Sequence, residues 1–279
     1  MKKLFYLRYI MALCMAGLMV TACDNIDEAD RLIYVEPESV DPVDDNGGDD
    51  GLEMVRRVVL LEDFTGQRCI NCPLGTEIIE QLQEEYGDTA FIAVGIHSGP
   101  LGFKGNVRTL GLATDLGDEY YNHWGFEYQP IGLVNRQGGA LNYTDWIRAV
   151  NTALTQTASL TLDVTATLNG GKLDITVDSR GVNGDTQGKL QLWIVEDGIT
   201  AMQLMPDGDA NADYVHNHVL RAAVNGAWGD DFSLAEGATD SRNYTGFALD
   251  EAWNVQRLRV VAFVYNDDGV QQAAVVGVE

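Results

Sequence analysis

The spacing of hydrophobic residues changes near Thr157, and this change limits the folds open to the 279-residue chain. Before Thr157, short apolar runs such as Val58–Leu61 and Phe91–Ile96 are separated by segments whose apolar residues recur at helical spacing. After Thr157, apolar and polar residues alternate, as in Leu160–Ala166 and Leu173–Val177. Continuous apolar runs are typical of buried strands, and strict alternation is typical of strands buried on one face. The sequence therefore predicts two parts with different architectures.

For residues 53–156 we expect an α/β domain in which strands and helices alternate around a central sheet. Its expected strands are 58–61, 91–96 and 131–134, and its expected helices are 74–86, 109–123 and 144–153. For residues 157–279 we expect an all-β domain, because several short alternating strands separated by turns are typical of an immunoglobulin-like sandwich. Its clearest strands are 160–166, 173–177, 190–194 and the hairpin 258–265 with 270–278.

The amino terminus has the composition of an export signal. Lys2, Lys3 and Arg8 precede an apolar run, Tyr9–Val20, which is too short to span a bilayer as a helix. The run ends at Cys23, and this ending resembles the lipobox of bacterial lipoproteins. The resemblance implies a signal peptide over residues 1–22 and a lipid anchor to the membrane at Cys23. An ordinary signal peptide that happens to contain a cysteine is the alternative.

Residues 24–52 contain eleven acidic residues and one basic residue, Arg31. Such a segment cannot bury enough apolar surface to offset the entropy of ordering, so we expect residues 23–52 to form a solvated tether behind the anchor. The whole chain has a formal charge of −24. Nucleic acid would be repelled by this charge, and we expect no nucleic-acid partner.

The four cysteines are divided among different roles. Cys14 leaves with the signal peptide, Cys23 carries the lipid, and only Cys69 and Cys72 remain for chemistry. Two thiols three positions apart cannot staple a fold, and no nearby Cys or His pair completes a zinc site. Thiol–disulfide chemistry is therefore the leading interpretation, and a permanently oxidised structural pair is the alternative.

The position of this Cys-x-x-Cys pair supports the interpretation, because it lies between a predicted strand and a predicted helix. The start of a helix offers free N–H groups and a positive dipole end, which stabilise a thiolate. Cys69 can then attack a substrate disulfide, and Cys72, one turn further on, can resolve the mixed disulfide. This role predicts that the Cys69 sulfur is exposed.

The segment Leu60–Pro73 resembles thioredoxin, in which an acidic residue stands six positions before the first cysteine. Asp63 occupies that position, and the resemblance implies that it relays a proton to or from Cys72. It also implies a cis-proline in the substrate groove, for which Pro130 is the candidate. Glu62 is adjacent to Asp63, so we expect one of the two carboxylates to face solvent.

Longer stretches are similar to outer membrane protein 28-related lipoproteins, which combine a thioredoxin-like domain with a β-rich part. The resemblance implies a cell-envelope lipoprotein of the outer membrane, on its periplasmic side or at the cell surface, with protein substrates or partners. One departure is Arg68, which replaces the aromatic residue usual before the first cysteine. The similar motifs are Glu62–Gly66, Ile96-His97, Pro130 with Gly132, Val134–Arg136 and Tyr214–Arg221.

Two other groups of residues could bind metal but lack complete ligand sets. His216 and His218 are spaced to share one face of a strand, yet no third ligand is evident, and a hydrogen-bonding pair is favoured. Asp207–Asp213 alternates oxygen ligands as a calcium loop does, but lacks the glycine and the bidentate glutamate. We expect no metal and no cofactor.

These observations lead to one hypothesis and one rival. The hypothesis is a lipid-anchored thioredoxin-like protein, a possible thiol–disulfide oxidoreductase, that acts through Cys69, Cys72, Pro130 and Asp63. The rival is a non-enzymatic binding or adhesion lipoprotein that uses the same fold as a scaffold.

Overall fold

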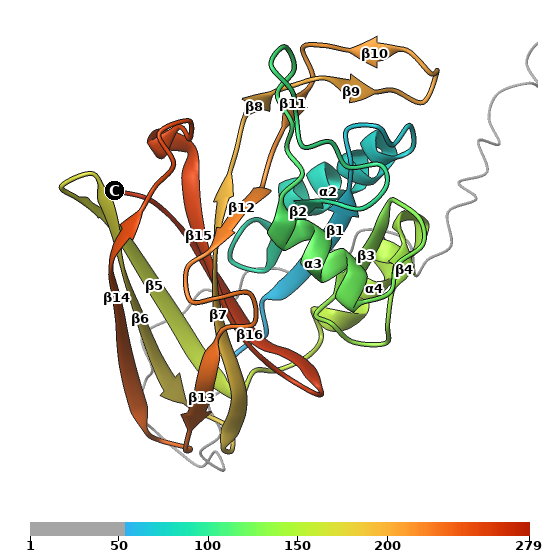
Figure 1. The fold of residues 1–279 in the computed structure, drawn as a ribbon. Coiled ribbons are helices and arrows are strands. Elements are labelled where there is room, and N and C mark those ends of the chain that lie inside the picture. The colour runs from blue at the N-terminus through green and yellow to red at the C-terminus, as the bar shows by residue number, and fades with distance from the viewer. Residues whose placement is uncertain (1–53) are drawn as a thin grey trace, which may run out of the picture.

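The computed structural model describes residues 54–279 (Figure 1). The expected signal peptide at 1–22, the expected lipidation of Cys23 and the expected tether lie outside the described residues. Within the described part, no helix is both long enough and apolar enough to cross a membrane.

The first part of the chain alternates strands and helices, as its hydrophobic pattern predicts. Val59–Thr65 and Phe91–His97 are buried along their whole length, and the helix between them begins at the second cysteine. The elements are β1 (Val59–Thr65), α2 (Cys72–Tyr86), β2 (Phe91–His97), α3 (Asp115–His123), β3 (Ile131–Val134), β4 (Leu141–Asn142), the 3-10 turn η2 (Tyr143–Asp145) and α4 (Trp146–Ala153).

The second part consists of strands and one 3-10 turn, and its expected hairpin of 258–265 with 270–278 is confirmed. The elements are β5 (Leu160–Asn169), β6 (Lys172–Gly181), β7 (Thr186–Glu196), β8 (Ile199–Thr200), β9 (Gln203–Leu204), β10 (Ala210–Asn211), β11 (Val215–His216), β12 (Val219–Ala223), β13 (Asp230–Leu234), β14 (Thr239–Ala248), η3 (Val255–Arg257), β15 (Leu258–Asn266) and β16 (Gly269–Gly277).

One mixed sheet runs through both parts, in the order β16-β15-β7-β12-β2-β1-β3-β4, with β13 also paired to β7. The junction is the parallel pairing of β12 with β2, where Val219 lies opposite Gly95. The backbone N–H of Gly95 donates to the carbonyl of His218 at 2.8 Å. Strands that follow Thr157 thus extend the sheet that β1 and β2 begin, so position 157 marks the end of the helical part without dividing the sheet.

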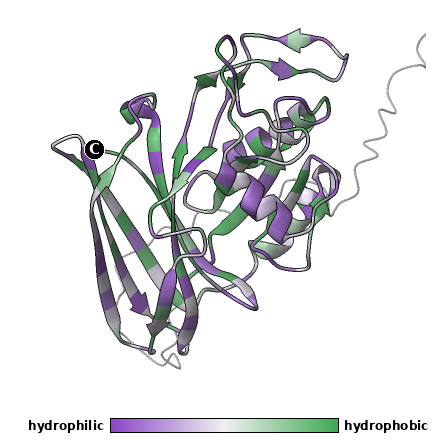
Figure 2. Cartoon of the chain, in the orientation of Figure 1, coloured by the Kyte–Doolittle hydropathy of each residue, from purple (hydrophilic) through white to green (hydrophobic). Residues whose placement is uncertain are grey.

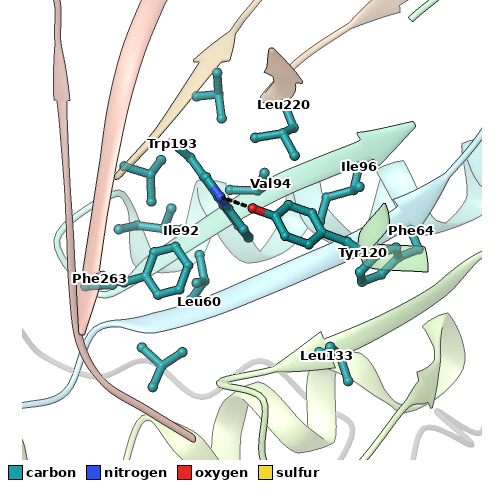
Figure 3. Close-up of a cluster of buried hydrophobic side chains, with 14 of the residues drawn as sticks. Leu60, Phe64, Ile92, Val94, Ile96, Tyr120, Leu133, Trp193, Leu220 and Phe263 are labelled. Atoms are coloured by element: carbon teal, nitrogen blue, oxygen red, sulfur yellow. Dashed lines mark hydrogen bonds between the residues drawn. The ribbon is translucent and has the colours of Figure 1, made fainter. Parts of the chain in front are cut away.

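The two faces of this sheet are covered by different elements, because side chains alternate along each strand. Val59 and Leu61 face a core beneath α2 and α4, whereas Leu60 and Phe64 face the core that includes α3. Figure 3 shows this second core, in which the Nε1–H of Trp193 on β7 donates to the Tyr120 hydroxyl of α3 at 3.0 Å. Strands from both parts of the chain therefore share one core.

A second layer of strands packs on the far side of β7 and β15. β14, β6 and β5 form a three-stranded antiparallel sheet, and its apolar residues meet Leu192 and Val260 in a separate core. Figure 2 shows hydrophilic and hydrophobic residues following one another along these strands. The described fold is a mixed α/β sheet region followed by antiparallel β-sheets, as the change of periodicity predicts.

The helix expected over residues 109–123 is too long by six residues, because α3 begins at Asp115. The Thr114 side chain caps it by accepting from the Gly117 N–H at 2.9 Å. Before Thr114 the chain folds back so closely that a Cβ at Gly111 would lie 1.9 Å from the Gly105 nitrogen. That contact requires glycine and cannot form within a helix, so residues 109–114 are a loop.

Candidate functional site

Cys69 and Cys72 form a disulfide at the point where the chain leaves β1 and enters α2. Cys72 is the first residue of the helix, and Pro73 follows in the first turn, where a missing N–H costs nothing. The turn is closed by the Cys69 N–H, which donates to the Gly66 carbonyl at 3.0 Å. The predicted arrangement of strand, dithiol and helix is confirmed.

The expectation that Cys69 is exposed is wrong. Cys69 has only 1% of its surface exposed and Cys72 only 2%. Gln203, itself buried on β9, donates from its Nε2 to the Cys69 carbonyl at 2.9 Å and to the Gly66 carbonyl at 3.4 Å. In Figure 1 the β9–β10 hairpin lies above the end of α2 at which the disulfide forms.

Two further backbone bonds hold the residues before Cys69. The N–H of Leu204 donates to the Gln67 carbonyl at 2.9 Å, and the N–H of Arg68 donates to the Leu101 carbonyl at 3.0 Å. Gly66 is required here, because a Cβ at that position would lie 2.4 Å from the Leu101 oxygen. We call residues 203–211 the cap, since its first strand bonds directly to the disulfide loop.

The two adjacent carboxylates of β1 are both buried, so the expectation that one faces solvent is wrong. Glu62 is 1% exposed and Asp63 is 3% exposed. They point to opposite faces of the sheet, because successive side chains on a strand alternate. Glu62 lies on the face of Leu60 and forms an ion pair with Arg136, whose Nε donates to Glu62 Oε1 at 2.5 Å.

Asp63 lies on the face covered by α2, and within residues 54–279 it forms no ion pair. Its Oδ1 is buried without a hydrogen-bond partner among the described residues. Burial raises the pKa of Asp63 to about 8, because a carboxylate is poorly stabilised away from water. The side chain can therefore hold or release a proton near neutral pH, which is the chemical property that a proton relay needs.

A small cavity of about 20 Å³ adjoins Cys72 and is lined by two histidines, His97 and His216, and by Tyr214. This volume is enough for about one water molecule. The two imidazole rings lie 5.1 Å apart, and His97 Nδ1 and His216 Nε2 are buried without partners among the described residues. The cavity thus brings ring nitrogens from β2 and β11 close to Cys72.

Both histidines are held neutral by their surroundings. Burial lowers the pKa of His216 to about 4, although it also bonds to backbone of Ala201 and Met202. Burial, the neighbouring His216 and the charge of Arg221 lower the pKa of His97. The sequence did not predict that these two histidines meet: it paired His216 with His218, whereas the structure places His216 beside His97.

The predicted cis-proline is confirmed, because the Gln129-Pro130 bond is cis. Pro130 lies beside α2, where a Cβ at Gly75 would be 3.6 Å from the proline Cβ. Gln129 Nε2 donates to the Thr65 carbonyl at 2.6 Å and to the Ser98 carbonyl at 2.9 Å. The proline is thereby tied to the end of β1 and to the loop that follows β2.

The remaining sequence candidates serve other purposes. Arg68 stacks on Phe103, with its guanidinium carbon 4.6 Å from the ring centroid. His216 and His218 do not share a strand face as expected, because β11 ends at His216 and His218 has a left-handed backbone with φ 47°. Among residues 54–279, no cluster of three or more His, Cys, Asp or Glu could hold a metal ion. The acidic loop Asp207–Asp213 is exposed and uses its side chains for local turns.

Removing the side chain of Gln203 should make the disulfide easier to reduce. Gln203→Ala loses bonds to the carbonyls of Gly66 and Cys69, each worth about 1 kcal/mol, so the open state of the cap should become about thirtyfold more populated. The rate of reduction by dithiothreitol, followed with a thiol reagent, should rise by the same factor. Gln256→Ala, at an exposed position, is the matched control. An unchanged rate for Gln203→Ala would show that the cap does not limit access.

Together, the fold and the site define a protein in which a Cys-x-x-Cys disulfide at a helix start is covered by a hairpin from the other half of the chain. The chain belongs to the family described as outer membrane protein Omp28, which matches residues 117–279. The expected outer-membrane location is confirmed by this membership. No curated protein matches the chain in sequence.

Solved structures with similar folds have low sequence identity. HBP35 of Porphyromonas gingivalis is 17% identical with a TM-score of 0.60, covering 80% of this chain and 76% of that one. AGR_C_4864 of Agrobacterium tumefaciens is 15% identical with a TM-score of 0.50, covering 79% and 94%. A domain of the outer membrane lipoprotein Omp28 of Porphyromonas gingivalis is 22% identical and covers 44% and 89%, but its TM-score of 0.31 is too low to inform the fold. The first two likenesses concern the fold alone.

Proposed function

We propose that this protein is a lipid-anchored outer-membrane protein that exchanges disulfides with protein substrates through Cys69 and Cys72. The observation that supports it most is the buried Asp63, which has an elevated pKa and lies on the face of β1 covered by the helix of Cys72. An ionisable group raised toward neutral pH without a charged partner destabilises the fold, and such groups concentrate at functional sites.

In the proposed exchange, a substrate thiolate attacks the sulfur of Cys69, and the Cys72 sulfur leaves as a thiolate. Asp63 supplies the proton that Cys72 takes up. A second substrate thiolate then attacks its partner sulfur in the mixed disulfide, which releases oxidised substrate and reduced protein. The reverse sequence reduces a substrate disulfide, with Cys69 attacking and Cys72 resolving.

This proposal requires the cap to move, because a 1%-exposed Cys69 cannot meet a substrate sulfur. It also includes the expected domain organisation: a signal peptide at 1–22, lipidated Cys23 with a tether to 52, a thioredoxin-like domain at 53–156 and an immunoglobulin-like sandwich at 157–279. The parallel pairing of β1 with β2 and the cis-proline beside α2 support the thioredoxin-like assignment. The packing of β14-β6-β5 on β7 and β15 supports the sandwich.

The second candidate is a binding or adhesion protein in which the disulfide is only structural. The burial of Cys69 beneath Gln203 favours it. The two candidates differ in reduction potential, since structural disulfides are typically below about −300 mV and cycling ones lie above.

Trapping with Cys72→Ala tests the exchange directly. In cells, this variant should accumulate mixed disulfides between Cys69 and envelope proteins, and reductant should release them. The double variant Cys69→Ala/Cys72→Ala is the control and should trap nothing. A reduction potential below about −300 mV, together with no mixed disulfide on Cys72→Ala, would contradict the proposed exchange and favour the binding role.

A further inference from the structure

A cavity of about 710 Å³ is lined by residues that are far from Cys69 and Cys72 in the sequence. The proposed exchange does not use this cavity. It is formed where the end of α3, the start of β7 and the turn between β15 and β16 meet. Its volume is typical of sites for small ligands. All of its lining residues fall within 117–279, the part of the chain that matches the Omp28 family, whereas Cys69 and Cys72 do not.

Aromatic rings form much of the wall. Trp124 and His123 come from the end of α3, Trp228 from the loop before β13, and Tyr265 from β15. The rings of His123 and Trp228 lie 4.2 Å apart, and the Tyr265 hydroxyl is held by the Trp228 carbonyl, to which it donates at 2.8 Å. These contacts fix flat apolar surfaces around the cavity before any ligand arrives.

Arg136 lines the same cavity with a side chain that is only 4% exposed. Its Nε and Nη2 donate to Glu62, and its guanidinium carbon lies 4.3 Å from the Tyr265 ring centroid. Within residues 54–279 the guanidinium makes no other hydrogen bond, so N–H groups remain for an acceptor in the cavity. Burying a charged side chain costs free energy, so an arginine buried this deeply at a cavity wall points to a binding role.

The backbone that delivers Arg136 is strained. Asn135 and Arg136 both have left-handed conformations, with φ of 50° and 54°. An arginine in this region is uncommon, and such outliers persist where surrounding contacts enforce them, often at functional sites. This backbone packs closely on the β15–β16 turn: the Val270 N–H donates to the Asn135 carbonyl at 2.8 Å, and a Cβ at Gly269 would lie 2.3 Å from that oxygen. The β15–β16 turn and Arg136 are therefore positioned together.

The polar groups around the cavity carry both signs of charge. Arg136 is offset by Glu62, and Lys189 by Asp231 at 2.6 Å, while Asp267 and Asp268 add carboxylates. A strongly anionic ligand would meet these carboxylates on a chain of charge −24, and a strongly cationic ligand would meet Arg136. The cavity suits a neutral ligand with apolar flat faces and many hydroxyl groups.

We propose that this cavity binds a carbohydrate. The indole and phenol rings would stack on the C–H faces of a pyranose ring, because aromatic side chains present large, rigid apolar surfaces. Arg136 would donate to ring or hydroxyl oxygens, and the carboxylates of Asp267 and Asp268 would accept from hydroxyls. This binding does not depend on the disulfide, so it is independent of the proposed exchange.

Affinity electrophoresis of the full-length mature protein tests the proposal. Native gels are cast with soluble starch, dextran, mannan, xylan or laminarin, and at least one of them should retard the wild-type protein. Trp228→Ala and His123→Ala should each weaken that retardation by about tenfold, since both remove a stacking ring. His123 is exposed, so its replacement leaves the core intact.

Trp253→Ala is the matched control, because Trp253 is a half-buried tryptophan packed on the sandwich core and outside the cavity. It should bind like wild type. No retardation by any of the five polysaccharides overturns the proposal. An equal loss of retardation in Trp253→Ala overturns the proposal as well. So does a protein that no polysaccharide retards but whose tryptophan fluorescence is quenched by adenosine or indole, because the cavity would then bind a flat aromatic ligand. Cys69→Ala/Cys72→Ala should bind normally even if the exchange fails.

Discussion

Replacing Glu62 with glutamine should lower the free energy of unfolding by about 3–5 kcal/mol, because it leaves a buried guanidinium without a counterion. Glu62 is 1% and the Arg136 side chain 4% exposed, so water has little access to the side of the guanidinium that faces the lost carboxylate. Burial alone would lower the pKa of Arg136, yet the Glu62 carboxylate raises it above its ordinary value. Arg136 therefore stays charged, and its charge must be compensated. Urea denaturation monitored by circular dichroism measures the loss.

The double variant Glu62→Gln/Arg136→Met separates the charge from the packing. Methionine keeps much of the apolar contact of Arg136 with Tyr265 and Phe263, and no buried charge remains. Its stability should return most of the way to wild type, since hydrophobic replacements of buried ion pairs are often neutral. Asp231→Asn, which removes the exposed partner of Lys189, is the control and should change stability little. A double variant as unstable as Glu62→Gln would contradict the electrostatic account.

The sequence predicted best what depends on neighbouring residues. The strand β1, the helix α2 and the turn that carries Cys69 and Cys72 follow from a continuous apolar run, a helical stripe and a proline at the helix start. These signals all lie within residues 59–86. The disulfide could therefore be placed on its secondary structure without knowledge of the rest of the chain.

The burial of that disulfide could not be predicted in the same way. The cap is made of β9 and β10, two-residue strands too short to show any periodicity. The hydrogen bond from Gln203 to the Cys69 carbonyl joins residues 134 positions apart. Nothing near Gln203 in the sequence marks it as a partner of a cysteine. The exposure of a site residue is thus set by tertiary contacts that local patterns do not record.

The same limit applies to the two carboxylates of β1. Alternation along a strand predicts that Glu62 and Asp63 point to opposite faces, and this is observed. The prediction that one of these faces is exposed to solvent is wrong, because α2 covers the face of Asp63 and Arg136 with α3 covers the face of Glu62. Burying two adjacent acidic residues destabilises the fold unless each carboxylate is paired or protonated. Glu62 is paired with Arg136, whereas Asp63 has a raised pKa and can stay protonated.

Replacing Asp63 with asparagine should remove a pH dependence from the stability of the oxidised protein. With a folded pKa of about 8 and an ordinary unfolded pKa, wild-type Asp63 stays protonated in the fold while it ionises on unfolding. The unfolded state then binds fewer protons, so wild-type stability falls as pH rises toward 8 and levels off above it. The asparagine side chain resembles the protonated acid and does not titrate.

His97 and His216 act in the opposite direction, because their folded pKa values are lowered. Their unfolded forms take up protons below the ordinary histidine pKa, so they reduce stability as pH falls through that range. This contribution is common to wild type and Asp63→Asn. The difference between the two proteins therefore isolates Asp63.

That difference should shift in favour of Asp63→Asn by about 2–4 kcal/mol between pH 5 and pH 8, at 1.36 kcal/mol for each unit over which only the unfolded state is ionised. Urea denaturation at several pH values under non-reducing conditions measures it. Asp163→Asn on β5, an exposed carboxyl, is the control and should track wild type at every pH. A constant difference across this range would mean that Asp63 is ionised in the fold. Its proposed role as the proton donor to Cys72 would then be lost, because a carboxylate that is already charged has no proton to give.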